Sequence, residues 1–306
     1  MAAHIGRDTY HLVWDAAIPP VLRVASGSVV SFDVLDASCG QLTAASTVAD
    51  IPALDFGRVD QVGGPVFVEG AEPGDTLEIE LLEFQPADWG WTACIPGFGL
   101  LTDEFPDPAL RITRLADGMG EFLPGVPIPV APFCGVLGLA SPGEPRGTIP
   151  PTEAGGNMDT RHLTAGTRLW LPVQVPGALF SLGDGHAAQG DGEVCGTAIE
   201  TPMQAQVRLT VRKDVKVTAP EFETAGPLGS ATNTAPWFAT DGVGPDLFAA
   251  ARDATRRMID RLGVRNGLTP ADAYMLISVA GELRISEIVD QPNWIVTCYV
   301  PTSIFG

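Results

Sequence analysis

The sequence predicts a mainly β protein with a smaller α+β portion near its carboxyl end. Short segments in which apolar and polar residues alternate recur over the first two thirds of the chain, and this period of two is typical of strands. The chain holds 35 glycines and 27 prolines in 306 residues, so turns are frequent and favour short strands over long helices. Helical patterns stand out only late in the sequence.

The alternation is clearest in three segments, 29–34, 76–81 and 207–212. In the first, Val30, Phe32 and Val34 share one face; in the second, the glutamates are expected to point outward. Pro73-Gly74 before the second segment predicts a type II turn, because Pro fixes φ and Gly accepts a positive φ. Residues 141–153 are rich in Pro, Gly and Thr and predict a loop, and residues 293–300 predict a closing strand.

Two helices are expected near 246–262 and 270–283. The first has an apolar stripe at helical spacing, with Pro245 in its first turn and Gly263 as its stop. The second begins after Thr269, whose hydroxyl is a good cap. We therefore expect a mainly β catalytic portion over 1–210 and an α+β portion over 211–306, packed together as one compact unit.

Charge and composition exclude several classes of protein. The net charge of −19 leaves no basic surface of the kind that nucleic acids require. No uninterrupted apolar run reaches the roughly 18 residues of a membrane span, and the amino terminus does not resemble a secretory signal. The five cysteines are scattered without a Cys-x-x-Cys pair, which predicts neither disulfides nor a structural zinc site. A cytoplasmic location is the expectation.

The chemistry is expected in a polar island over 183–196. This stretch combines glycines with Asp, His, Gln and Glu, and it lies between the apolar runs 169–180 and 194–199. Glycine-rich backbone can approach a ligand closely. A polar segment framed in this way forms either a tight turn or the lining of a cavity, and we expect the cavity.

Metal chemistry is a natural use of such a cavity. A hydrolytic zinc site needs about three protein ligands from His and carboxylate. His162 and His186 are the only well-placed histidines, so carboxylates must complete the site. Asp184 and His186 would share a face in a strand, and Asp159 and His162 would share one in a helix. No fixed zinc motif is present, and Ca²⁺ at an oxygen-rich site stays open.

Cys195 offers a second mechanism, as a thiolate nucleophile with Glu193 as its base. The two residues would lie on one side of a strand. Cys195 also begins an apolar run, which favours an inert buried thiol.

Several segments resemble the acetamidase/formamidase family. They are 64–75, 155–160, 169–181, the Asp-Gly-His-Ala-Ala-Gln-Gly-Asp-Gly-Glu run within 183–194, and 272–287. The resemblance extends in order from about residue 10 to the end. It implies a β-sandwich plus a barrel-like part, a homo-oligomer, and hydrolysis of short aliphatic amides to carboxylate and ammonia.

The resemblance also reaches Asp36, and with it we assign roles. A divalent metal, Zn²⁺ or alternatively Ca²⁺, is expected to be held by Asp36, Asp159 and His186. His186 and Glu193 are the expected catalytic residues. Glu193 would take a proton from water and deliver it to the leaving amine.

Asn157 and Gln189 are expected to hold the small amide substrate. The segments 97–101 and 117–123 differ from what the resemblance leads us to expect, and they are candidates for the substrate pocket. A lactam or other cyclic amide is an alternative substrate. A different class of function is also an alternative: a ligand-binding β-sandwich of the same family that catalyses no reaction.

Overall fold

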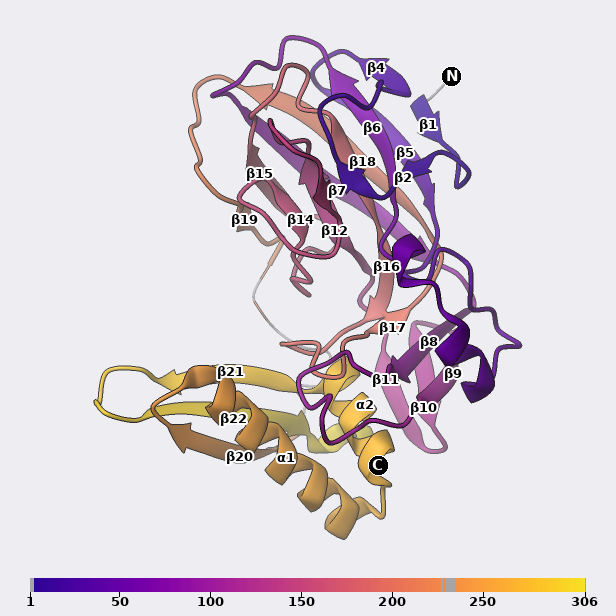
Figure 1. The fold of residues 1–306 in the computed structure, drawn as a ribbon, viewed down its shortest axis with the longest axis vertical. Helices are drawn as coiled ribbons and strands as arrows, with labels where there is room; N and C mark the ends of the chain where they lie inside the picture. The colour runs from indigo at the N-terminus through magenta and orange to yellow at the C-terminus, as the bar shows by residue number, and fades with distance from the viewer. Residues whose placement is uncertain (1–2, 227, 229–234, 306) are drawn as a thin grey trace.

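A computed structural model describes residues 3–226, 228 and 235–305. Figure 1 shows two large sheets in its upper part and a smaller α+β unit below them. The first sheet has six strands, in the order β1 (Ala3–Ile5), β5 (Ser28–Val34), β18 (Met203–Arg212), β7 (Thr76–Pro86), β15 (Arg168–Pro172) and β19 (Glu221–Glu223).

The second sheet has eleven strands and holds the polar island. Its main order is β11 (Val126–Pro129), β10 (Met119–Leu123), β9 (Ala109–Ala116), β8 (Trp89–Cys94), β17 (Ile199–Glu200), β16 (Phe180–Ala188), β12 (Phe133–Leu139) and β14 (Gly155–Asn157). The remaining strands are β6 (Val62–Val68), which pairs with β16, and β2 (Tyr10–His11) and β4 (Leu22–Val24), which pair with β6. A separate ribbon joins β3 (Val13–Trp14) to β13 (Arg146–Gly147) within the expected loop.

The alternating segments form the strands expected of them. In β5, Val30, Phe32 and Val34 are all buried. Glu78 lies on the outward face of β7 as expected, since Leu77 and Ile79 beside it enter the core, but its side chain is buried there by neighbouring strands. The indole of Trp170 donates a hydrogen bond to its carboxylate and Arg212 pairs with it, so two neighbouring strands satisfy the charge.

The Pro73-Gly74 turn is confirmed. Gly74 has φ of 89°, and the amide of Asp75 donates to the carbonyl of Glu72 across the turn at 2.9 Å. The turn carries the chain from β6 in the second sheet to β7 in the first, so it connects the two layers.

The carboxyl-terminal unit holds both expected helices, α1 (Leu247–Asn266) and α2 (Pro270–Ala280), with the three-stranded sheet β20 (Trp237–Gly244), β22 (Trp294–Pro301) and β21 (Glu282–Glu287). Two expected helix ends are wrong. Pro245 precedes α1 instead of lying in its first turn, because Asp246 is the N-cap. The helix continues through Gly263 to Asn266, and Gly267, with a left-handed φ of 69°, ends it. Thr269 caps α2 as expected, accepting from the amide of Asp272.

The sheets are open: among the described residues no sheet closes into a barrel, so the barrel-like part is not found. Three short 3₁₀ helices complete the structure, η1 (Val48–Ala53), η2 (Phe56–Arg58) and η3 (Thr302–Phe305). One apolar core lies around the first sheet, and a second combines strands of the second sheet with α1 and α2. The division of the chain at residue 210 stays a prediction. No helix in the described ranges is long and apolar enough to cross a membrane.

Candidate active site

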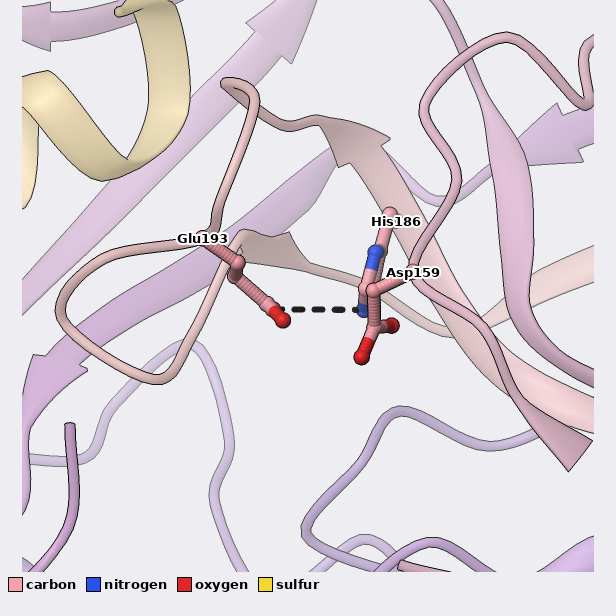
Figure 2. A group of neighbouring side chains, drawn as sticks. All are labelled: Asp159, His186 and Glu193. Carbon is pink, nitrogen blue, oxygen red and sulfur yellow. Dashed lines mark ion pairs between the residues drawn. The ribbon is translucent and has the colours of Figure 1, made fainter. Parts of the chain in front are cut away.

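The centre of the site is His186, on the buried strand β16 between β12 and β17. Its Nε2 faces three carboxylates: Asp184 Oδ2 at 3.0 Å, Glu200 Oε2 at 3.2 Å and Glu193 Oε1 at 3.9 Å. Asp184 lies two residues away on the same strand, so the shared face expected from the sequence is confirmed. Figure 2 shows Glu193 and Asp159 reaching the imidazole from two different loops.

Gln189 fixes the orientation and the tautomer of His186. Its Nε2 amide donates to the carbonyl of Asp159 at 2.6 Å, so its Oε1 must face the ring, where it lies 2.9 Å from Nδ1. Nδ1 therefore carries the hydrogen and donates it to Gln189. In the neutral ring the lone pair of Nε2 then points toward the carboxylates.

Several atoms at this point have no hydrogen-bond partner within the described part of the chain. They are His186 Nε2, Glu200 Oε2, Asp184 Oδ1 and Asp159 Oδ1. The close approaches to Nε2 are thus within ion-pair distance but lack hydrogen-bond geometry. Buried polar atoms are normally satisfied, and converging unpaired nitrogen and oxygen atoms are the pattern of a cation site.

The neighbouring strand makes room for this cluster with a glycine. Gly135 lies on β12 opposite Asp184, between the paired positions Cys134–Gly185 and Val136–Gly183. A Cβ at this position would overlap the carboxylate oxygens of Asp184 and Asp159. Only glycine therefore lets β12 pair with β16 while the acidic side chains stand between them.

The backbone of the site is strained. Asp60, Asp159, Asp184 and Glu193 have φ of 53°, 44°, 58° and 41°. They are four of the eight non-glycine residues with positive φ that the described ranges contain. Such conformations cost energy and concentrate at functional sites.

Burial and neighbouring charges shift the pKa of these groups. Burial alone lowers the pKa of His186, but the charges of Asp184 and Glu200 outweigh it and raise that pKa well above its usual value. Burial raises the pKa of Asp159 to about 6. Burial and the charge of Asp159 raise the pKa of Glu193 well above its usual value.

Asp60 is a further acidic group that the sequence did not indicate. Burial raises the pKa of Asp60 well above its usual value, and the charges of Asp184 and Asp159 add to the effect. Among the described residues, no lysine or arginine forms an ion pair with any carboxylate of this cluster, and His186 is its one basic partner.

The cluster lies at one side of a cavity. Asp60, Asp159, Asp184, Glu193 and Glu200 line it, together with Asn157 and apolar residues from other segments. Phe98 from the segment 97–101 is part of this lining. Residues of 117–123 line a different hollow on the surface, with Arg114 and Pro127.

Two groups of residues could hold a metal ion: Asp184, His186 and Glu200, and Asp159, His186 and Glu193. Asp36, an expected ligand, is in neither group. One of its carboxylate oxygens accepts hydrogen bonds from the amide of Ser38 at 3.0 Å and from the indole of Trp91 at 2.9 Å. The structure brings Asp184 and Glu200 to His186 instead.

The other candidates are placed as follows. Asn157 lies in the cavity wall and its Oδ1 is buried without a hydrogen-bond partner in the described structure, whereas Gln189 binds His186. His162 is outside both metal groups, because the positive φ of Asp159 prevents the helix that would have joined them.

Cys195 is fully buried beside Thr197 and Ala93 and does not line the cavity. Burial raises the pKa of its thiol, but hydrogen bonds with Cys94, Ser278 and Thr197 outweigh burial and lower the pKa to about 7. The thiol nevertheless lies behind the wall of the site rather than in it.

Comparison with known proteins identifies the family. The family model described as the Acetamidase/Formamidase family matches residues 3–145 and 143–306, which together span the chain. This chain belongs to the acetamidase/formamidase family. The resemblance noted in the sequence is thereby confirmed.

Three named proteins are similar to nearly the whole of this chain. The formamidase of Methylophilus methylotrophus is 28% identical over 96% of this chain and 89% of its own. The acetamidase structure from Bacillus halodurans is 32% identical, with a TM-score of 0.71 over 97% of this chain and 96% of its own. The γ-lactamase from Delftia acidovorans is 26% identical, with a TM-score of 0.90 over 97% of this chain and 89% of its own.

Proposed function

We propose that this protein hydrolyses the C–N bond of short aliphatic amides to carboxylate and ammonia, with water activated at His186 and its carboxylates. The family supports the amidase reaction. One observation carries the site: Nε2 of His186 and oxygens of Asp184, Glu200 and Glu193 converge on one buried point, beside the cavity that these carboxylates line.

The donor atoms suit a divalent cation. An imidazole nitrogen with two carboxylates is a ligand set of catalytic zinc, whereas Ca²⁺ takes oxygen alone. Asp184, His186 and Glu200 would hold the ion, and their unpaired buried atoms support this choice. A cation also offsets the charge of carboxylates that have no lysine or arginine partner. When bound, it polarises the amide carbonyl and lowers the pKa of water.

The chain itself then supplies the proton transfers. Glu193 reaches the same point from a loop rather than from the strands that carry the ligands, and its Oε1 is 3.9 Å from Nε2. We assign it the role of general base: it takes a proton from the attacking water and gives it to the nitrogen as the C–N bond breaks. The unpaired Oδ1 of Asn157 accepts a hydrogen bond from the amide NH₂.

A lactam is the second candidate substrate, favoured by the TM-score of 0.90 to a protein named γ-lactamase. The third possibility, a binding protein without turnover, is disfavoured by the complete cluster around His186, which retains both ligands and base.

The deciding experiment measures ammonia release from formamide, acetamide and a γ-lactam, before and after exhaustive chelation. We expect activity to disappear with chelation and to return with Zn²⁺. Activity that persists in protein shown by elemental analysis to hold no metal would overturn the metal-assisted route and leave the amidase. Absence of turnover on every linear and cyclic amide, in metal-loaded protein, would contradict the amidase itself.

A homo-oligomer in the cytoplasm belongs to the same proposal. The described cysteines are all free, as a reducing compartment requires. Exposed apolar side chains on the carboxyl-terminal unit, including Val243 and Ile285, offer a surface for self-association. Light scattering of the purified protein tests the assembly, with a monomeric mass as the contrary result.

A further inference from the structure

The cavity has two chemically different walls. One is lined by the carboxylates of Asp60, Asp159, Asp184, Glu193 and Glu200, and the other, which we call the apolar wall, is made largely of hydrophobic side chains. Its main members are Leu54, Phe56, Val59, Trp91, Ile95 and Phe98. A bare amide group needs only the polar wall, so the apolar wall must serve another part of the ligand.

Phe56 and Phe98 are the exposed aromatic residues of the apolar wall. Phe56 is on η2, and Phe98 follows β8 in the tight turn that its amide closes on the carbonyl of Ile95 at 3.0 Å. Their rings meet edge to face with centroids 6.0 Å apart, although they come from segments about forty residues apart. Both rings stay well exposed, at 42% and 39%, so a ligand in the cavity would cover apolar surface that is in water without it.

Phe98 is held in a fixed relation to the proposed base. Gly196 lies against its ring, and a Cβ there would come within 2.5 Å of Phe98 Cδ1. The amide of Leu100 donates to the carbonyl of Val194 at 2.9 Å. The segment that carries Phe98 is therefore bound to the residues that directly follow Glu193.

Trp91 connects the apolar wall to the polar one. It is 2% exposed, and its indole nitrogen donates to Asp36, which sets the plane of the ring. On the adjacent strand β17 its paired residue is Glu200. The wall is thus built beside a proposed metal ligand.

We propose that this wall binds the acyl group of the amide, and that the protein prefers a saturated acyl group of about four carbons to formyl or acetyl. The inference rests on the proposed amidase function and names its substrate class. Formamide places only a hydrogen against Phe56, Phe98 and Trp91 and gains nothing from them. Each added methylene should raise kcat/KM about fourfold, because it leaves water for an apolar surface.

The test is steady-state hydrolysis of formamide, acetamide, propionamide and butyramide by the metal-loaded protein. We expect kcat/KM for butyramide to exceed that for formamide on the order of 50-fold. Phe98→Ala should lower this ratio about tenfold, and Phe98→Leu, which keeps apolar bulk, should restore most of it. The matched control is Phe222→Ala on β19, an equally exposed phenylalanine outside the cavity, which should leave the ratio unchanged.

A wild-type preference for formamide, or a ratio that Phe98→Ala does not alter, would refute the proposal that this wall binds the acyl group. The proposed amidase activity would still stand. If no amide is hydrolysed, the proposed amidase activity is refuted. Calorimetric binding of the product acids then tests whether the apolar wall binds the acyl group. Butyrate should then bind tighter than formate to wild type, with the difference reduced in Phe98→Ala. Equal affinities would refute the inference.

Discussion

Glu200 lies directly opposite His186 where β17 pairs with β16, and its Oε2 is 3.2 Å from His186 Nε2. The other carboxylate oxygen of Glu200 accepts from the amide of Ala198 at 2.8 Å, so the group cannot rotate away. The two residues are fourteen positions apart in the chain, and the sheet alone makes them neighbours.

Glu200→Gln should therefore cost metal affinity, because an amide is a poorer ligand than a carboxylate. We expect a loss greater than the roughly 10- to 100-fold typical of residues that only orient a ligand. Competition with a chelator measures it. Glu223→Gln, an exposed glutamate on β19, is the control. A Glu200→Gln protein with full affinity would remove Glu200 from the ligand set.

Glu193→Gln should separate proton transfer from metal binding. Turnover should fall about 10²- to 10⁴-fold, the usual contribution of a general base, while metal content stays that of wild type. Ammonia release and elemental analysis on the same sample check both parts. Turnover within a few-fold of wild type would show that another group takes the proton.

Gln189→Met should weaken metal binding about 10- to 100-fold, since the imidazole loses the acceptor that fixes its tautomer. The readout is again chelator competition, and Gln204→Met on the exposed side of β18 is the matched variant. Equal affinities in the two variants would mean that Gln189 does not orient His186.

Gly135→Ala should disrupt both fold and site. The new methyl group overlaps two carboxylates, and overpacking of this kind costs about 1–3 kcal/mol of stability. Urea unfolding, followed with the metal content, measures the effect. Gly147→Ala on β13 adds a Cβ in open space and should change neither quantity. Similar behaviour of the two variants would refute the packing argument.

Cys195→Ala should retain turnover within about threefold, because the thiol lies outside the cavity and the smaller side chain costs mainly core packing. Ammonia release per mole of folded protein is the measurement. A variant that keeps its metal but loses turnover would instead support the thiolate mechanism.

The sequence predicted the strands and helices better than it predicted the site. The alternation of apolar and polar residues lies within β5 itself, and the capping residue of α2 directly precedes that helix. Local sequence patterns were therefore enough to predict both elements. Asp184 could be paired with His186 because two residues along one strand determine a shared face. Glu200 could not, since its position depends on the register between β17 and β16, which leaves no local signal.

Asp36 shows a different limit of the sequence. The indole of Trp91 and the amide of Ser38 satisfy one of its carboxylate oxygens, and the other has no hydrogen-bond partner within the described residues. It lies outside both groups around His186, and its metal role stays a prediction. Asp60 was missed because its segment is irregular and reaches the cavity only through the fold. In both cases long-range packing sets the surroundings of the carboxylate.

The exposed aromatic pair of the apolar wall and the acidic cluster lie on different stretches of the chain. Phe56 and Phe98 lie in connecting segments, whereas Asp184, His186 and Glu200 lie on paired strands. Substitutions in these connecting segments can therefore alter the apolar wall without displacing the groups around His186. One framework could in this way accept acyl groups of different size, with its catalytic strands unchanged.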